Sequence, residues 1–525
     1  MSYSHRLNFF LLLFFLGSGP LLSGICHAQL PSSEPAYQEQ YRPQFHFSPI
    51  ANWMNDPNGL FFHKGNYHLF YQYNPDSTIW GPMHWGHATS GDLVHWEHQA
   101  PALSPDAAGM IFSGSVVVDH QNTSGLGQND QVPILAYYTA HRMDWEQDHR
   151  LDFQNQAMAF SLDDGLSWEK YNHGHPVLFN PGIKDFRDPK VFWHSPTQRW
   201  IMLLAAGDHI AIWNSGNGID WDYCSDFYGP KLEADGVWEC PDLLKMPVGN
   251  TQTYKYVLLV SVNAYGPFGG SATKYFVGDF DGRTFTSDQQ NTLWVDYGKD
   301  NYAGVSWNNI PREDGRLLTI GWMNNWEYAQ NTPTERWRSA MTVPKRLSLE
   351  KAANQYLLKS HPIEALKSLR EEAIAVADVR LGHPAPQQQF FTNDLSGAFE
   401  LSLTIMESDA QQFGLWLHNV QGDTFQVMYN ASEQKIITDR SKAGTFFSRE
   451  GFYSKPTFVE WPKRYPLKLH LLVDWSSVEL FVQNGEKAMT NTFYPSTAIT
   501  SITAFSHGGN SAFENIEVFP LKSIW

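Results

Sequence analysis

Short apolar runs of strand length dominate the first two thirds of the chain. Residues 67–71, 134–138 and 256–260 combine β-branched, aromatic and aliphatic side chains, as β-strands do. Before residue 350 there is almost none of the three-to-four-residue spacing that marks an amphipathic helix. The pattern therefore predicts an all-β fold.

A turn that ends in an aromatic residue recurs four times. It reads SGDLVHW at 90–96, LDDGLSW at 162–168, SGNGIDW at 215–221 and DFDGRTF at 279–285. Asp, Asn and Gly favour tight turns, and we expect the aromatic residue to anchor the following strand. Repeats of roughly 50 to 70 residues with about four short strands are typical of propeller blades. Residues 42–350 have room for five blades, and an array of β-sandwiches with coincidental turns is the alternative.

The pattern changes after residue 350. Ile363, Leu366 and Leu369 predict a short helix within a linker that spans residues 351–385. From residue 386 to residue 525, apolar and polar positions alternate, as they do from Phe399 to Ile405. The Asn-Gly pair at 484–485 predicts a hairpin turn. This part is predicted to be a C-terminal β-sandwich.

Composition narrows the class of protein. Of the 525 residues, 42% are hydrophobic and only 17% are charged, which excludes disorder over most of the length. The net charge of −17, with no basic tract, argues against nucleic acid or an anionic membrane surface as a partner. The aromatic content of 15% exceeds what packed cores alone require.

The N-terminus predicts export. Arg6 precedes an apolar run at 9–16, and Ala28 is a residue that signal peptidase accepts, so residues 1–28 are interpreted as a cleaved signal peptide. Lipid attachment at Cys26 is the weaker alternative. No later stretch reaches the roughly 20 apolar residues of a transmembrane helix. The remaining cysteines, Cys224 and Cys240, are too few for a disulfide framework, although they are free to pair with each other.

Three acidic residues lie next to prolines at matching places in their repeats. Asp56 lies in WMNDPNG at 53–59, Asp188 in FRDP at 186–189 and Glu239 in ECP at 239–241. Each occupies the opening segment of its repeat, where proline favours the start or end of an inner strand. The inner strands of a propeller surround its axis, so we expect the three carboxylates to converge there. Each motif alone is more typical of a turn or a structural ion pair. Together they predict a pair of carboxylates with divided roles, which glycosidic bond cleavage requires.

These three motifs resemble those of glycoside hydrolase family 32, the β-fructofuranosidases, which include invertases, inulinases and levanases. The resemblance covers nearly all of the chain after the signal, including YQYNP at 71–75, WGH at 85–87, FSGS at 112–115, GWMNNW at 321–326 and DWSSVE at 474–479. It implies a five-bladed β-propeller followed by a β-sandwich, as the repeats predict.

The resemblance also implies roles for the acids. Asp56 would be the nucleophile of a retaining mechanism, Glu239 the acid/base, and Asp188 a stabiliser of the transition state. Arg187 would orient Asp188 and bind the sugar. We expect burial and nearby negative charge to raise the pKa of Glu239, and hydrogen-bond donors to keep Asp56 ionised. Cys240 would pack beside Glu239 and tune it.

Further sugar contacts follow from the same resemblance. They are Asn55, Gln72, Trp80, Phe112, Ser113 and Trp326, with Trp322 as the alternative to Trp326. The reaction needs no metal and no organic cofactor.

The substrate class follows from the resemblance of residues 269–275 and 296–303 to exo-acting inulinases and levanases. We predict a secreted or periplasmic enzyme that releases terminal β-fructose from levan, inulin and sucrose. Endo action, transfer of fructose to another sugar, and a fructan-binding propeller without catalysis are the alternatives. The sandwich is expected to brace the propeller, with polysaccharide binding and dimerisation as its other possible roles.

Overall fold

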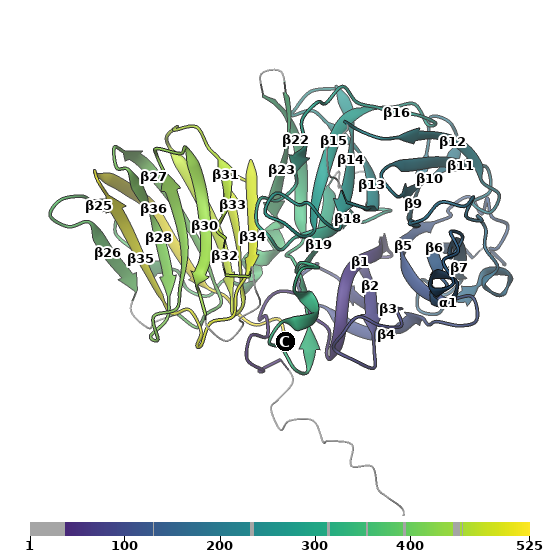
Figure 1. Ribbon diagram of the computed structural model, residues 1–525, viewed down its shortest axis with the longest axis horizontal. Helices are drawn as coiled ribbons and strands as arrows, with labels where there is room; N and C mark the ends of the chain where they lie inside the picture. Colours follow the sequence, from purple (N-terminus) through teal and green to yellow (C-terminus); the bar gives the residue numbers. More distant parts are fainter. Residues whose placement is uncertain are drawn as a thin grey trace, which may run out of the picture.

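The computed structural model describes residues 37–525 except 130, 231–235, 312–315, 353–354, 392–394, 445–451 and 454. The predicted signal peptide and Cys26 lie outside the described residues. The chain forms two all-β parts that lie side by side: a ring of sheets and a sandwich (Figure 1). The all-β prediction is confirmed.

The strands from Asn52 to Pro362 form five sheets, each a meander of four main strands. The first sheet comprises β1 (Asn52–His63), β2 (Asn66–Asn74), β3 (His84–Ser90) and β4 (Glu97–Leu103), with β20 (Trp337–Arg338) added beside β1. The second comprises β5 (Met110–Val118), β6 (Ile134–His141), β7 (Gln154–Ser161) and β8 (Glu169–Lys170). The third comprises β9 (Phe186–His194), β10 (Arg199–Ala206), β11 (Ile210–Ser215) and β12 (Asp222–Phe227).

The remaining two sheets follow the same plan. The fourth comprises β13 (Trp238–Pro247), β14 (Tyr254–Val262), β15 (Ala272–Phe280) and β16 (Phe285–Thr286), with β17 (Leu293–Trp294) also pairing with β15. The fifth comprises β18 (Tyr302–Ser306), β19 (Leu317–Met323), β22 (Lys345–Ala352) and β23 (Gln355–Pro362), with β21 (Ala340–Met341) beside β19. The helices are α1 (Met143–Gln147) and three 3₁₀ helices, Tyr171–Gly174, Ala329–Asn331 and Glu364–Leu369.

The first strand of each sheet lies at the inner side of the ring (Figure 1). These strands contact one another in closed order, from β1 to β5, β9, β13, β18 and back to β1. The parallel pairing of β20 with β1 adds a late segment of the chain to the first sheet. The result is the propeller arrangement that the repeats predict, with the inner strands around its axis.

The recurring turns occupy equivalent places. Each connects the third strand of its sheet to the fourth, and its side chains cap the turn's own backbone. Asp92 Oδ1, for example, accepts hydrogen bonds from the backbone N–H groups of Val94 and His95 at 2.8 Å each. Asn217 and Asp281 accept the corresponding bonds in their own turns. The conserved geometry explains why Asp, Asn and Ser recur at these positions.

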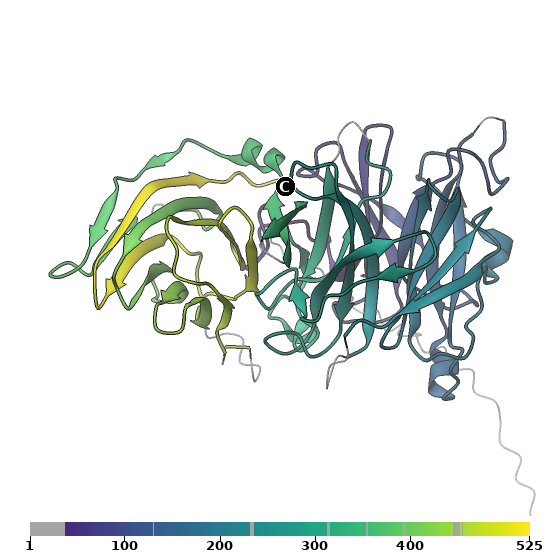
Figure 2. The same ribbon diagram turned by 90° about the horizontal axis from the view of Figure 1, so that it is seen from above.

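The sandwich consists of two antiparallel sheets (Figure 2). One holds β24 (Ile374–Ala375), β25 (Val379–Leu381), β27 (Phe399–Ser408), β32 (Leu467–Asp474), β33 (Ser477–Val482), β34 (Lys487–Thr492) and β36 (Ser511–Pro520). The other holds β26 (Gln387–Phe391), β28 (Gln412–His418), β29 (Thr424–Asn430), β30 (Lys435–Lys442), β31 (Thr457–Glu460) and β35 (Ser501–His507). The alternating apolar residues of β27 and β32 face the core between the sheets, as predicted.

The structure places the transition between the two parts differently from the sequence. β23 lies inside the segment predicted to be a linker, because it pairs with β22 along its whole length. β24 and β25 also lie inside that segment, and both pair with β36 of the sandwich. Only residues 363–373 remain between the two parts, and they include the 3₁₀ helix where the sequence predicts a helix. Strands of two and three residues carry too little alternation to be recognised.

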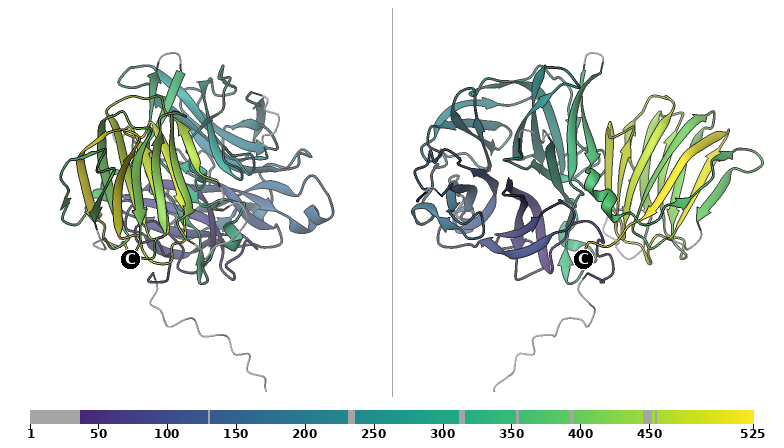
Figure 3. Two further views of the ribbon diagram at one scale, coloured as in Figure 1. Left: turned by 60° about the vertical axis from the view of Figure 1, so that its left-hand side comes forward. Right: turned by 180° about the vertical axis from the view of Figure 1, so that it is seen from behind.

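A propeller segment runs along the sandwich edge strand β34. The backbone N–H of Tyr297 donates to the carbonyl of Ala488 at 2.7 Å, and that of Lys299 donates to Thr490 at 2.9 Å. Gly298 lies between them, and a Cβ there would stand 2.0 Å from the Thr490 carbonyl oxygen. The contact requires glycine, and Figure 3 shows how closely the sandwich and the ring adjoin.

Candidate active site

The three acidic residues lie on the inner strands of three different sheets. Asp56 belongs to β1, Asp188 to β9 and Glu239 to β13. Each lies at or beside a β-bulge, where the pairing with the next strand shifts register. A proline follows Asp56 and Asp188 directly, and another lies two residues after Glu239. These prolines have no backbone N–H to donate to the hydrogen bonds between strands. The bulges thus explain why these carboxylates share a proline context.

All five inner strands carry such a bulge. The other two shifts lie between Ile111 and Gly114 in β5 and between Tyr302 and Val305 in β18. Asp188 and Cys240 adopt positive φ angles of 63° and 46° at their bulges. Such backbone is costly for residues other than glycine and is typical of functional sites.

Cys240 connects the acids in space. Its thiol lies 3.9 Å from Asp56 Oδ2 and 3.6 Å from Asp188 Oδ2, and its backbone N–H donates to Asp188 Oδ2 at 2.9 Å. Glu239 is the preceding residue. Three carboxylates that are far apart in sequence therefore share one pocket, as their repeat phase predicts.

Arg187 is the cation beside these acids. Its guanidinium donates to Glu239 Oε1 at 2.7 Å and to Asp185 Oδ1 at 2.8 Å. No hydrogen bond joins the described side chains of Arg187 and Asp188, and Asp188 accepts one from the backbone N–H of Cys240. The charge of Arg187 still lowers the pKa of Asp188 against the effect of burial, so its predicted role in orienting Asp188 stays a prediction.

Burial dominates the electrostatics of the site. It raises the pKa of Glu239 to about 7, assisted by the charge of Asp188 and opposed by Arg187. This direction agrees with the sequence prediction. Burial and the charge of Glu239 raise the pKa of Asp56 to about 8, whereas we expected donors that keep Asp56 ionised. No described residue donates a hydrogen bond to Asp56 Oδ1. With so few donors to offset it, burial raises the pKa of all three acids.

Aromatic and amide side chains surround the acids. Trp53 donates its indole N–H to Asn55 Oδ1 at 2.7 Å, and its ring stacks on that of Trp326 with centroids 5.9 Å apart. Trp80 meets Phe112 edge to face at 6.0 Å on another side. These rings are partly exposed, except for Trp53, which is fully buried.

The remaining predicted contacts are buried. Trp322 is fully buried behind Trp326, which leaves Trp326 as the one of the pair with accessible surface. Gln72 donates to Asn58 Oδ1 at 3.0 Å. Ser113 lines a small hollow together with Asp188 and Cys240.

Sequence reasoning missed three supporting residues. Asp185 holds Arg187, Asn58 holds Gln72, and Thr139 Oγ1 accepts the backbone N–H of Asp188 at 3.0 Å. Asp185 and Arg187 are only two positions apart in the sequence, so an acidic partner for Arg187 could have been sought there. Thr139 lies in β6 and only the fold brings it close.

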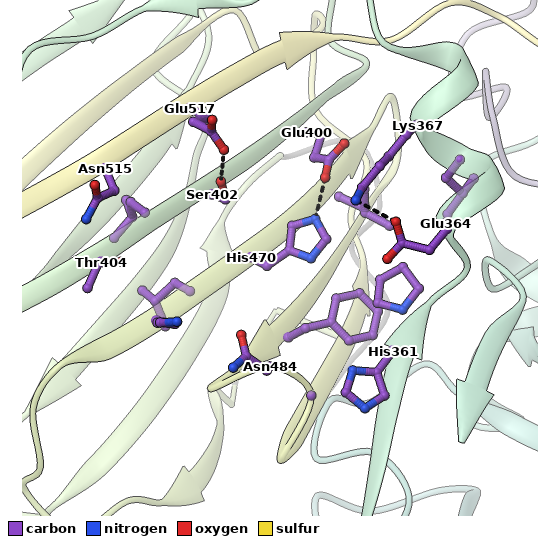
Figure 4. A pocket seen from close by; sticks show the side chains of 18 of the residues that line it. His361, Glu364, Lys367, Glu400, Ser402, Thr404, His470, Asn484, Asn515 and Glu517 are labelled. Atoms are coloured by element: carbon purple, nitrogen blue, oxygen red, sulfur yellow. Dashed lines mark hydrogen bonds and ion pairs between the residues drawn. The ribbon is translucent and has the colours of Figure 1, made fainter. Parts of the chain in front are cut away.

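A second hollow lies between the linker and the sandwich, and its acids differ from those of the site (Figure 4). Glu400 accepts hydrogen bonds from Arg370 and His470 at 2.7 Å, and Glu364 pairs with Lys367. Burial opposed by these partners leaves the pKa of Glu400 at about 2. A carboxylate that is fully paired and always ionised is unsuited to acid/base catalysis at neutral pH.

Within the described residues, Cys224 and Cys240 are both free thiols. No helix in that part of the chain is long and apolar enough to cross a membrane.

Family models match almost the whole described chain. Residues 46–362 match the N-terminal domain of glycosyl hydrolases family 32, and residues 365–520 match the C-terminal domain of the same family.

Individual relatives agree over similar lengths. A levanase of Bacillus subtilis is 41% identical over 495 residues, which cover 93% of this chain and 72% of the levanase. An extracellular exo-inulinase of Aspergillus niger is 38% identical over 545 residues, covering 96% of this chain and 98% of the relative. The crystal structure of an exo-inulinase from Aspergillus awamori superposes with a TM-score of 0.84 at 35% identity, covering 93% of this chain and all of that one.

Proposed function

The chain belongs to glycosyl hydrolase family 32, and from that premise we propose that it releases terminal β-D-fructofuranose from fructans and sucrose by a retaining, two-step mechanism. The observation that carries the proposal is the convergence of Asp56, Asp188 and Glu239 on one buried pocket beside Arg187. The levanase and exo-inulinase names of its relatives support the substrate class.

In the first step, a carboxylate oxygen of Asp56 attacks C2 of the terminal fructose. The bond from C2 to the leaving oxygen breaks, and Glu239 donates its proton to that oxygen. The pKa of Glu239, near 7, suits it to this role, because the group is protonated at mildly acidic pH and still acidic enough to give its proton up. Arg187 occupies Oε1 and leaves Oε2 without a described partner.

In the second step, Glu239 removes a proton from water, and the water oxygen attacks C2. The ester bond to Asp56 breaks and fructose leaves with its β configuration retained. Fructose hydroxyls can donate to Asp56 Oδ1, which accepts from no described residue, so their binding lowers the pKa of Asp56 and favours its ionised form. Asp188 accepts further sugar hydroxyls and stabilises the positive charge that develops in the transition state.

The sugar itself packs against the rings and amides around the acids. We assign its contacts to Asn55, Gln72, Trp80, Phe112, Ser113, Arg187 and Trp326. Partly exposed rings suit the apolar C–H faces of a sugar.

Two substitutions separate the steps. Asp56→Ala and Glu239→Ala are each expected to lower kcat on sucrose by at least about 10³-fold. With an aryl β-fructofuranoside, whose leaving group needs no proton, Glu239→Ala should retain the first step. Azide should then accelerate turnover and give the β-fructosyl azide, whereas in Asp56→Ala azide can only replace the missing carboxylate and give the inverted α-fructosyl azide. Rescue of Asp56→Ala with the same retained product would refute the assigned roles.

Products resolved over time test exo action. Chromatography should show free fructose from the first minutes on levan and inulin. Early oligosaccharides would instead assign endo action, and trisaccharides that accumulate at high sucrose would assign transfer.

We also propose that the protein is exported. The relative from Aspergillus niger is an extracellular exo-inulinase, and the predicted signal peptide ends at Ala28. Sequencing of the mature protein should begin at Gln29, and a mature chain that keeps Met1 would refute cleavage.

A further inference from the structure

An open groove follows the boundary between the propeller and the sandwich. One hollow, of about 1200 Å³, lies between propeller residues 267–269, Lys299 and Glu327 and the sandwich strands β28 to β31. A second, of about 600 Å³, continues from it along β17, β31 and the start of β34. Both hollows are lined by Pro267, Phe268, Glu433 and Phe458, so they form one continuous groove.

The floor of the groove is the outer face of a sandwich sheet. The side chains of Met428, Lys435, Ile437 and Asp439 alternate with buried ones and are partly exposed on this face. This mixture of apolar and charged groups differs from the core of a protein–protein interface, which is depleted in charged residues.

Aromatic rings from both parts of the molecule meet in the groove. Phe268 of the propeller lies edge to face with Phe458 of the sandwich, with centroids 5.0 Å apart. Phe458 is 37% exposed, and the Lys435 ammonium lies 4.1 Å from the centre of its ring. Trp294, Tyr297 and Trp461 line the continuation.

The charges of the groove cancel. Lys299 pairs with Glu327 at 2.5 Å, and Lys435 pairs with Glu433 at 3.0 Å. The lysines of the two hollows are matched in number by carboxylates: Lys299, Lys435, Lys455 and Lys487 against Glu327, Glu433, Asp439 and Glu460. A groove without net charge suits a neutral polymer and offers no field that would attract an ionic one.

The propeller wall of the groove is tied to the candidate active site. The buried Asn325 side chain donates to the carbonyls of Ser271 and Lys299 at 3.2 and 2.8 Å, so it joins both wall segments. Its oxygen also accepts the backbone N–H of Glu327 at 3.0 Å. Glu327 directly follows Trp326, the ring that stacks on Trp53 beside Asn55. The groove and the catalytic pocket therefore share one rigid element.

From these observations we propose that the groove binds the chain of a β-fructan while its terminal unit occupies the catalytic pocket. This rests on the proposed function. It gives the sandwich a role in selecting polymeric over short substrates. Ring faces would stack on fructose units, and the paired charges and amides would accept and donate hydrogen bonds to hydroxyl groups.

The double variant Phe268→Ala/Phe458→Ala tests the proposal. We expect KM for long-chain inulin and levan to rise about 5-fold, while kcat/KM for sucrose stays within 2-fold of the wild type. In the catalytically inactive background Glu239→Gln, native gels cast with either fructan should show retardation of the protein, and the double variant should lose it.

Tyr254→Ala is the matched control, because Tyr254 is also an exposed ring under a lysine but lines neither hollow. It should leave both substrates unaffected. The proposal would be refuted if the double variant had an unchanged KM for long fructans. It would also be refuted if kcat/KM for sucrose fell by the same factor as kcat/KM for long fructans. If sedimentation shows that the wild type is a dimer and the double variant a monomer, the groove is a subunit contact and the proposal is refuted. If the wild type releases no fructose from any substrate, the proposed function itself has failed, and this is seen before any groove variant is measured.

Discussion

Two buried clusters of charge in this molecule have opposite electrostatics. At the propeller axis, three carboxylates lie close together beside Arg187, and burial raises the pKa of Asp56 and of Glu239. At the propeller–sandwich boundary, Glu479 lies among partners: Lys345 at 2.6 Å, His46 at 3.1 Å and the backbone N–H of Val343 at 2.7 Å. These partners lower the pKa of Glu479 to about 2 despite complete burial.

The contrast shows that burial alone does not decide the state of a carboxyl group. Both clusters pay the same kind of desolvation cost, and the number of donors decides whether it is offset. His46 completes the boundary cluster, because its ring lies between Asp474 and Glu479, which raise its pKa to about 9. The boundary cluster holds the two parts together, whereas the axial cluster has few donors to offset the burial of its acids.

The largest expected effect comes from breaking the boundary cluster. Glu479→Ala leaves the ammonium of Lys345 and the ring of His46 without their buried partner. Loss of one member of a buried ion pair costs about 3–5 kcal/mol, so we expect the free energy of unfolding at pH 7 to fall by that amount. Chemical denaturation followed by fluorescence measures it. A loss below about 1 kcal/mol would show that the cluster does not brace the two parts.

The pH dependence of the same variant sharpens the comparison. The folded pKa of Glu479 lies below its unfolded value of 4.5, so its contribution is present above pH 4.5 and is lost as pH falls toward 2. The wild type should lose stability over that window, and Glu479→Ala should lose less of it. An identical acid limb in the two proteins would contradict the assignment.

The axial cluster should respond in the opposite direction. Asp56→Asn removes a carboxyl whose folded pKa, about 8, lies far above its usual value of 3.8. Such a group lowers stability as pH rises from about 4 to 8, so its removal should raise the free energy of unfolding at pH 8, by up to about 5 kcal/mol, while abolishing activity. The gain should shrink at pH 4. A variant that is less stable than the wild type at pH 8 would show that Asp56 is held by donors after all.

Much of the fold could be predicted from local pattern. The recurring turns mark the link between third and fourth strands because their Asp, Asn and Ser side chains cap their own backbone, and local interactions leave a sequence signal. The alternation in β27 and β32 predicted a sandwich face for the same reason. β24 and β25 could not be found, since strands this short are defined only by their pairing with β36.

The candidate site divides along similar lines. The three acids were found because each carries a proline at a bulge, which is a local requirement. The partners of Arg187 and the holding of Asp188 by Cys240 were not, because they depend on positive φ angles and on which face each side chain takes at the bulge. The pKa of Asp56 is raised because burial is offset by few hydrogen-bond donors. No sequence motif marks a site where donors are missing.

A smaller loss of stability is expected where backbone hydrogen bonds, rather than ion pairs, join the propeller to the sandwich. Gly298→Ala places a methyl group 2.0 Å from the Thr490 carbonyl oxygen, so the hydrogen bonds from Tyr297 and Lys299 to β34 must lengthen. We expect a loss of about 1–2 kcal/mol, as overpacking of a closed contact costs. Thermal unfolding measures it, and Gly304→Ala, which meets only one atom at 4.0 Å, is the control. Equal melting temperatures for the two variants would contradict the close contact.

The smallest effect is expected at the surface, where water supplies the donors. Arg380 and Glu407 form an ion pair with nitrogen and oxygen 3.0 Å apart, but both side chains are 72% exposed. Glu407→Gln should change the free energy of unfolding by less than about 0.5 kcal/mol, because solvent screens the pair and solvates either side chain without it. The same denaturation measurement as for Glu479→Ala tests this at low and at high salt. If Glu407→Gln lowered the free energy of unfolding as much as Glu479→Ala, the comparison would fail. Pairing geometry, rather than burial and the number of donors, would then decide how much a carboxylate contributes to stability.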